Sequence, residues 1–151
     1  MKKTAIILLA FSIGFVACKK KEKEPTKTEL LQGGKWKLTA ASAFGGAYDL
    51  LPSLKDCMKD NFYTFNTNKT ITVDEGSTKC NSSSEQTYTD GNWALSNSDT
   101  KIVIDGGAIT AGLGSLSGNI VSLTNTTLQV RKDTTVSGVT TTIDITFTNN
   151  K

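Results

Sequence analysis

The strongest constraint on this chain is a strict alternation of apolar and polar side chains near its C-terminus. Between Val139 and Thr148, one set of alternate positions holds Val, Thr, Ile and Phe, and the other holds only Thr and Asp. A repeat of two residues places the apolar side chains on one face of a β-strand, whereas a helix would scatter them around its axis. The segment therefore predicts a long strand with one buried face. The positions on that face are Val139, Thr141, Ile143, Ile145 and Phe147.

Seven further segments carry weaker forms of the same pattern. In the first, Trp36, Leu38 and Ala40 alternate with polar residues, which predicts that all three point inward. The only stretch that favours a helix is a short turn near residues 51–59. The seven strands are expected at residues 35–40, 61–66, 70–74, 86–96, 101–105, 119–124 and 127–133.

Eight consecutive strands that each bury one face fit an antiparallel up-and-down barrel, because closure removes the exposed edges of an open sheet. A sandwich of two sheets is the alternative. The length of 151 residues suits one all-β domain. Alternate links of such a meander lie at the same end, which predicts a turn end and a loop end. The expected short links are 67–69, 97–99 and 125–126, and the expected longer links are 42–60, 75–85, 106–118 and 134–138.

The chain contains no His. This composition excludes Ser-His-Asp and Cys-His catalysis and His-ligated zinc, and it removes the usual general base near neutral pH. No two carboxylates stand out as a glycosidase pair. The acidic residues Asp60, Asp74 and Glu75 lack the oxygen-ligand spacing of a calcium loop. We therefore expect no enzyme, no cofactor and no metal site.

The first seventeen residues have the plan of a bacterial export signal. Two early Lys are followed by thirteen mostly apolar residues, against roughly twenty for a membrane-spanning helix. The segment ends Phe15-Val16-Ala17-Cys18, which resembles the lipobox where a lipoprotein signal is cut and the new N-terminal Cys is acylated, for example with palmitate. We expect a lipoprotein signal peptide at 1–17 and a lipid on Cys18. An ordinary signal followed by a chance Cys is the alternative.

Residues 18–28 are expected to form a charged, flexible tether. Positions 19–27 hold five Lys and two Glu, a run too polar to fold. From 28 to 151, ten basic residues face twelve acidic ones, so the positive charge of the chain belongs to the signal and tether, and no nucleic-acid partner is expected. The domain at 29–151 would be held on a lipid bilayer through Cys18, in the bacterial cell envelope at the outer membrane.

Cys57 and Cys80 remain once Cys18 is assigned to the lipid. An exported protein matures in an oxidising compartment, which favours a disulfide between them. Two free thiols are the alternative, because two cysteines alone supply too few ligands for a thiolate metal site. Both cysteines lie in or beside long links, so the bridge would lie at the rim of the loop end. The tether would leave from the turn end, and the loop end would face away from the membrane.

Four short motifs resemble a known family. Gly34-Lys35-Trp36 looks like the G-x-W that opens the lipocalin barrel, and Gly91-Asn92-Trp93 repeats it. Between them stand Cys57-Met58-Lys59-Asp60-Asn61 and, before Cys80, Asp74-Glu75-Gly76. This order is similar to the lipocalin-like domain of exported lipoproteins from Bacteroidetes-type bacteria, which implies a lipocalin-like barrel across about residues 29–148. Two departures are the lack of a C-terminal helix pattern and the outward parity of Arg131, which cannot cover Trp36 as an inward Arg would.

An eight-stranded barrel is wide enough either for packed side chains or for one small ligand. No charged residue clearly faces the interior, so a neutral apolar ligand is expected. The residues expected inside are Trp36, Leu38, Tyr63, Phe65, Ile71, Val73, Trp93, Leu95, Ile102, Ile104, Val121, Leu123, Leu128, Val130, Ile143, Ile145 and Phe147. The seven expected to bind a ligand are Trp36, Tyr63, Phe65, Trp93, Ile104, Leu123 and Phe147. Residues that could line an opening or cap the core are Phe44, Tyr48, Met58, Ile109, Leu113 and Leu116.

Two functions follow from this reasoning. The first is a membrane-anchored lipoprotein whose lipocalin-like barrel binds a small hydrophobic ligand. The second is an accessory or adhesion lipoprotein with a packed barrel that binds a protein or glycan through its loop end. A continuous void of a few hundred Å³ that opens among the long links would favour the first function.

Overall fold

The structure is a computed structural model, and it describes residues 23–110, 115–136 and 138–150. The predicted signal peptide at 1–17 and the predicted lipid site Cys18 lie outside the described residues. Among the helices of the described part, none has the length and apolar character needed to cross a membrane.

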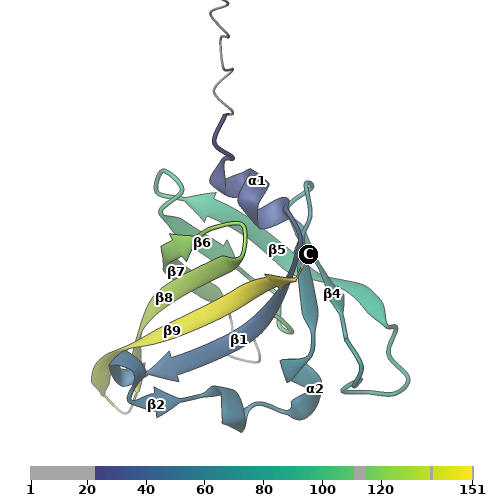
Figure 1. Ribbon diagram of the computed structural model, residues 1–151. Helices are drawn as coiled ribbons and strands as arrows, with labels where there is room; N and C mark the ends of the chain where they lie inside the picture. Colours follow the sequence, from purple (N-terminus) through teal and green to yellow (C-terminus); the bar gives the residue numbers. More distant parts are fainter. Residues whose placement is uncertain (1–22, 111–114, 137, 151) are drawn as a thin grey trace, which may run out of the picture.

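The strands of the described residues form one antiparallel sheet in which β1 pairs with β2 and β3, and each strand from β3 to β8 pairs with the next along the chain. The last strand, β9, pairs back with β1 and closes the sheet into a barrel (Figure 1). The two-residue strand β2 only extends the end of β1, so eight strands form the barrel wall. The predicted barrel is confirmed and the sandwich is excluded. The strands are β1 (Lys35–Ala43), β2 (Tyr48–Asp49), β3 (Phe62–Phe65), β4 (Thr70–Asp74), β5 (Thr87–Ser96), β6 (Lys101–Ile104), β7 (Leu116–Leu123), β8 (Thr127–Val136) and β9 (Val139–Asn150).

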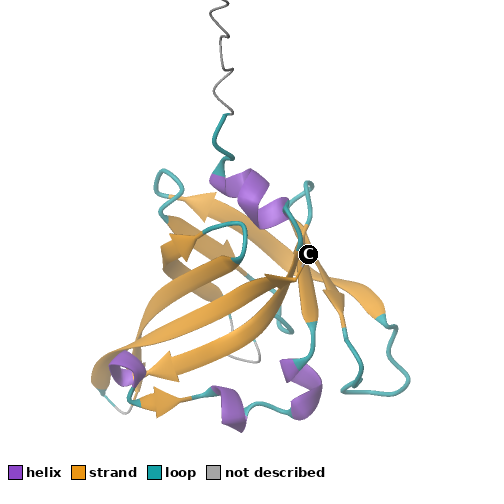
Figure 2. Ribbon diagram, viewed as in Figure 1, coloured by secondary structure: helices purple, strands orange, loops and turns teal. Residues whose placement is uncertain are grey.

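The helices are short and lie at the two ends of the barrel (Figure 2). The predicted turn near 51–59 is confirmed as the 3-10 helix η2 (Leu51–Ser53) and the α-helix α2 (Asp56–Lys59). A further 3-10 helix, η1 (Phe44–Gly46), follows β1. Helix α1 (Lys27–Gln32) was not expected, and its first two residues fall within the segment assigned to the tether.

Helix α1 lies across the turn end of the barrel (Figure 1). Lys27 Nζ donates to the carbonyl of Asp99 at 2.7 Å, in the turn between β5 and β6. The side chain of Leu31 is fully buried, and its carbonyl accepts a hydrogen bond of 2.7 Å from Trp36 Nε1. The buried indole of Trp36 is therefore satisfied by α1, while Arg131 points outward, as expected, and pairs with Asp144 at 2.6 Å.

The opposite end carries the links β1–β3, β4–β5 and β6–β7, as expected. The predicted long link at 134–138 is wrong, because β8 and β9 stay paired as far as Val136 and Val139. The loop end therefore has three long links and one tight hairpin. Thr134 and Thr135, which were expected in a loop, pair with Thr141 and Thr140 and so continue the hairpin to its tip.

Two predicted inward positions are wrong, and β-bulges explain both. In β1, the register to β9 shifts between Leu38 and Ala40, so Ala40 is exposed and Ala41 is buried. In β7, the register to β8 shifts between Ile120 and Ser122, so the side chain of Val121 is 49% exposed. An extra residue in one strand reverses the inward and outward parity of everything beyond it.

The other predicted inward residues form the core, and large aromatic side chains fill the half of the barrel nearer the turn end. Phe65 and Trp93 meet edge to face with ring centroids 5.6 Å apart, and Trp93 Nε1 donates to the carbonyl of Asn66 at 3.1 Å. Tyr63 and Phe147 make a similar contact at 6.2 Å. Edge-to-face pairs of this kind are favourable arrangements of aromatic rings in a dense core.

Candidate functional site

The seven residues predicted to bind a ligand all belong to the barrel core. Six of them are at most 2% exposed, and Leu123 is partly buried against the same cluster. They pack in one hydrophobic cluster, and none of them lines either of the two cavities described below. Ligand binding by these seven residues stays a prediction. The cavities of the barrel are lined by other residues, nearer the loop end.

The link between β6 and β7 folds into the loop end of the barrel. Ile109 and Thr110 are only 2% and 3% exposed, so this segment is part of the core. The carbonyl of Ala108 accepts a hydrogen bond of 3.1 Å from Tyr63 Oη, and its N–H donates to Asp90 Oδ2 at 2.6 Å. Two side chains of the barrel wall thus hold the segment in place, and Ile109 fills space that a larger ligand would need.

Two glycines allow the segment to come this close to the wall. Gly91 has a φ of +75°, and a Cβ atom built on it would lie 2.5 Å from the Cα of Gly106. It lies at the bulge where β5 shifts its register against β4. Only glycine tolerates both the left-handed backbone and the backbone contact.

Two small cavities lie beside Thr110 and Ile145. The first, which we call the Lys132 cavity, has a volume of about 90 Å³ and is lined by Thr110, Leu116, Lys132, Thr134, Ile143 and Ile145. The second, the Leu54 cavity, has about 70 Å³ and is lined by Leu38, Ala41, Leu50, Ser53, Leu54, Ile109, Thr110 and Ile145. Thr110 and Ile145 form a wall common to both. The continuous void of a few hundred Å³ that would mark a large interior site is therefore not among these cavities. Larger hollows of 270 and 260 Å³ lie beside Glu29 of α1 and beside the outward Phe62.

The Leu54 cavity lies between β1 and the link that follows it, at a place where β1 has no neighbouring strand. β3 pairs with β1 only at Trp36 and Lys37, so the rest of β1 has no neighbour strand there until β2. The segment around η2 covers this gap, anchored by a hydrogen bond of 2.8 Å from Leu50 N to the carbonyl of Ala41.

Lys132 overturns the expectation that no charged residue faces the interior. Its side chain lines the first cavity, and its Nζ donates to the carbonyl of Ser115 at 2.9 Å. The residue has the same parity as Leu128 and Val130, which are fully buried. The inward position of Lys132 could have been predicted from the sequence, because the alternation of inward and outward residues in β8 continues past Val130.

Buried polar residues at the loop end were missed for the same reason. Asn61 is two residues before Tyr63 and Glu75 two residues after Val73, and both are at least 95% buried. Burial raises the pKa of Tyr63 to about 12. Burial, and next the negative charge of Glu75, also raises the pKa of Tyr88. Alternate residues of a strand thus keep pointing inward beyond the last apolar residue from which the strand was recognised.

The residues proposed to line the opening divide into three groups. Ile109 and Leu116 are buried in the core, and Met58 is partly buried. Phe44 and Tyr48 are 49% and 59% exposed on the rim. Leu113 lies outside the described residues.

The rim is held by the predicted disulfide, which is confirmed. Cys57 in α2 and Cys80 in the β4–β5 link are bridged, with their Cα atoms 5.0 Å apart. Beside the bridge, Asp60 Oδ2 accepts hydrogen bonds of 2.9 Å from two backbone N–H groups, those of Ser77 and Thr78. These contacts join the β1–β3 link to the β4–β5 link.

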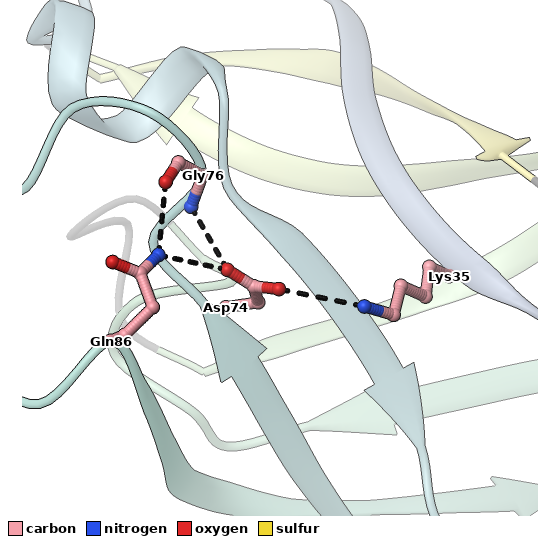
Figure 3. Close-up of polar contacts among 4 residues, drawn as sticks. All are labelled: Lys35, Asp74, Gly76 and Gln86. Atoms are coloured by element: carbon pink, nitrogen blue, oxygen red, sulfur yellow. Dashed lines mark hydrogen bonds and ion pairs between the residues drawn. The ribbon is translucent and has the colours of Figure 1, made fainter.

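Asp74 holds the base of the same β4–β5 link (Figure 3). Its carboxylate accepts from Gln86 Nε2 at 2.9 Å and from Gly76 N at 3.2 Å, and Lys35 Nζ lies 3.5 Å from it. These contacts lower its pKa, the Gln86 hydrogen bond most of all. Asp60 and Asp74 thus stabilise turns, and the described residues contain no group of three or more His, Cys, Asp or Glu placed to hold a metal ion.

Comparisons with known proteins bear on the family of this barrel. A family model described as a lipocalin-like domain matches residues 33–130. A lipocalin-like protein from Bacteroides uniformis is similar over 80% of this chain and 99% of its own, with 15% sequence identity and a TM-score of 0.46. Bovine odorant-binding protein in complex with undecanal is similar over 87% of this chain and 78% of its own, with 17% identity and a TM-score of 0.45. The search of curated proteins gave no sequence match.

The matched range covers well over half of the chain and contains both G-x-W motifs, Gly34-Lys35-Trp36 and Gly91-Asn92-Trp93. The resemblance predicted from those motifs is thereby confirmed. The chain belongs to the family of lipocalin-like domains.

Proposed function

We propose that this protein is an exported, lipid-anchored barrel that binds a small apolar molecule at its loop end. The observation that carries the proposal is the pair of neighbouring cavities, which share Thr110 and Ile145 and are lined mainly by carbon atoms. Concave, mostly apolar sites with a few polar groups are the usual form of a small-molecule site.

The cavity volumes set the size of the ligand. Sites for drug-sized molecules measure roughly 300–1,000 Å³, and a cavity of about 150 Å³ accommodates benzene. At about 90 and 70 Å³, each cavity suits a short alkyl chain of a few carbon atoms. A long-chain lipid would have to displace Ile109, whose segment is held by Tyr63 and Asp90.

A binding experiment tests this proposal directly. We expect ¹²⁹Xe and 1-butanol to shift the methyl resonances of Ile109, Ile143 and Ile145 in NMR titrations. Ile145→Phe should abolish these shifts, because the larger ring fills the common wall. Thr146→Phe adds the same ring at the next position, outside the barrel, and should leave the shifts unchanged. Shifts that survive in Ile145→Phe would contradict the proposed site.

The lipid anchor is supported by the sequence around Cys18, and the position of α1 sets the orientation that it would give the barrel. The chain enters the barrel at Thr26, the N-cap of α1, and α1 covers the turn end. A lipid on Cys18 would therefore hold the turn end near the bilayer and leave the loop end facing away. Metabolic labelling with an alkynyl palmitate analogue should mark the full-length chain, and Cys18→Ser should lose both the label and the membrane fraction. A labelled Cys18→Ser protein would contradict the anchor.

A second candidate function rests on the exposed aromatic residues of the rim. Phe44 and Tyr48 are 49% and 59% exposed at the loop end, where aromatic faces are available to a protein or a sugar ring. If the rim is the binding surface, the double variant Phe44→Ala/Tyr48→Ala should lose binding in a glycan or protein array. The same variant should keep its 1-butanol shifts, which separates this function from the first.

A further inference from the structure

We propose that the Lys132 cavity selects a short-chain carboxylic acid, with the carboxylate held by Lys132 and Thr134 and the alkyl chain among Leu116, Ile143 and Ile145. This inference rests on the proposed function and names the chemical class of the ligand. It also replaces the neutral ligand expected from the sequence, because it begins from a charged group in the cavity wall.

The position of Lys132 sets the polarity of the cavity. Inward residues of β8 run from Leu128 and Val130 to Lys132 and Thr134, so the wall changes from carbon to polar groups toward the hairpin tip. Lys132 lines the cavity, and its Nζ donates to the carbonyl of Ser115 at an exposed position, as expected of a long basic side chain whose charged end reaches solvent. A ligand in this cavity therefore meets carbon at its inner end and an ammonium group at its outer end.

The ammonium of Lys132 has donors to spare. It donates to one backbone carbonyl, that of Ser115, whereas an ammonium group has three N–H donors. Among the described residues, the ion pairs are Lys35–Asp74, Lys59–Asp56 and Arg131–Asp144, and Lys132 takes part in none. Asp144, on the neighbouring strand, is engaged by Arg131 through two hydrogen bonds of 2.6 and 3.0 Å.

An anion with an alkyl tail fits this arrangement better than the alternatives. A carboxylate oxygen accepts a charge-assisted hydrogen bond from an ammonium, which is stronger than the bond a neutral amide or alcohol accepts. An inorganic anion would satisfy Lys132 but leave the carbon-lined part of the cavity unfilled. The volume of about 90 Å³ limits the tail to a few carbon atoms.

The test compares butyrate with butanamide, its neutral analogue of nearly the same shape. We expect the full-length protein to bind butyrate about tenfold more tightly than butanamide, with both dissociation constants measured from NMR shift titrations. Lys132→Met keeps the stem and removes the charge, so it should abolish this preference by weakening butyrate about tenfold more than butanamide. Lys101→Met removes an exposed Lys from β6 and should change neither affinity. Folding of each variant is checked by its melting temperature.

Further arms separate the inference from the proposed function. Thr134→Val should weaken butyrate more than butanamide, which gives a second variant if Lys132→Met does not fold. Raised NaCl should weaken butyrate alone, because salt screens the ion pair. Equal affinities of the wild-type protein for butyrate and butanamide would overturn the inference while the apolar site stands. Undiminished butyrate binding in Ile145→Phe would place the anion at the surface and also overturn it. Failure of butyrate, butanamide and 1-butanol alike would overturn both.

Discussion

At the residue scale, a close contact between two backbones joins the hydrogen bonds of Tyr63 and Asp90 in holding the β6–β7 link at the loop end. Gly91 lies at φ +75°, and any Cβ there would come within 2.5 Å of Gly106. This contact brings the β6–β7 link against β5 and so helps to position Ile109 in the wall of the Leu54 cavity and Thr110 in the walls of both cavities.

We therefore expect Gly91→Ala to destabilise the protein by roughly 2 kcal/mol or more, since it combines backbone strain with a steric clash. Gly107→Ala is the matched control, because nothing lies within 4 Å of a Cβ at that position. Urea unfolding of the two variants measures the difference. Equal free energies of unfolding would show that the contact carries no constraint.

A second prediction at the residue scale concerns Tyr63 and alkaline pH. Burial raises the pKa of Tyr63 from 10.0 to about 12, so the folded state holds the phenol proton more tightly than the unfolded state. Its contribution is fully present below pH 10 and is lost as the pH rises toward 12, by about 2–3 kcal/mol. The free energy of unfolding should therefore fall between these two pH values.

Tyr63→Phe should make that fall smaller, because the titrating group is gone. A residual fall is expected from Tyr88, whose pKa is also raised. Tyr48→Phe, at an exposed position, should keep the full pH dependence of the wild-type protein. An identical pH profile for Tyr63→Phe and wild type would contradict the assignment.

At the scale of elements, α1 covers the turn end of the barrel. Its start is fixed by a capping box, in which Thr26 and Glu29 exchange side-chain and backbone hydrogen bonds. Its buried contact with the barrel is Leu31, which is fully buried and whose carbonyl accepts the indole hydrogen bond of Trp36, and Lys27 adds the hydrogen bond to Asp99. Six residues are too few for a stable isolated helix, so packing on the barrel stabilises α1.

Leu31→Ala should consequently lower the free energy of unfolding by about 2–4 kcal/mol through the cavity it leaves. The fluorescence of the nearby Trp36 should change as well. Leu30→Ala, at the partly buried neighbouring position, should cost clearly less. A Leu31→Ala protein as stable as Leu30→Ala would mean that α1 does not contribute to the barrel core.

At the scale of the whole molecule, the disulfide joins two links that enclose the loop end. Cys57 and Cys80 are separated by 23 residues, and the enclosed loop contains β3 and β4. In the chain-entropy model, a loop of this size stabilises the folded state by about 3 kcal/mol. Reduction with dithiothreitol should lower the free energy of unfolding by that amount. The double variant Cys57→Ala/Cys80→Ala should be equally destabilised in the absence of reductant and insensitive to its addition.

The alternation along the strands accounts for the parts of the fold that could be predicted. Because inward and outward positions follow directly from a two-residue repeat, β9, the closed barrel and most of the core follow from side-chain type alone. Ala40 and Val121 were placed wrongly because a bulge is a property of two paired strands, and one strand does not reveal it. Helix α1 was missed because its six residues have a single buried contact and no lasting periodicity.

The candidate site was harder to predict than the fold. Lys132 and Glu75 could have been found by extending the inward parity of β8 and β4 past their last apolar residue. The cavities could not, since their size depends on how far the β6–β7 link enters the barrel and on the gap that the short β3 leaves beside β1.

The sequence by itself determined the barrel, the family motifs and the cysteine pair, because these depend on local repeats and on residue chemistry. Only the tertiary structure decided where space is left inside and which charge borders it. Such volumes are small differences between the positions of side chains from β1, β8, β9 and the β6–β7 link, which are distant in the chain and meet only once the barrel has closed.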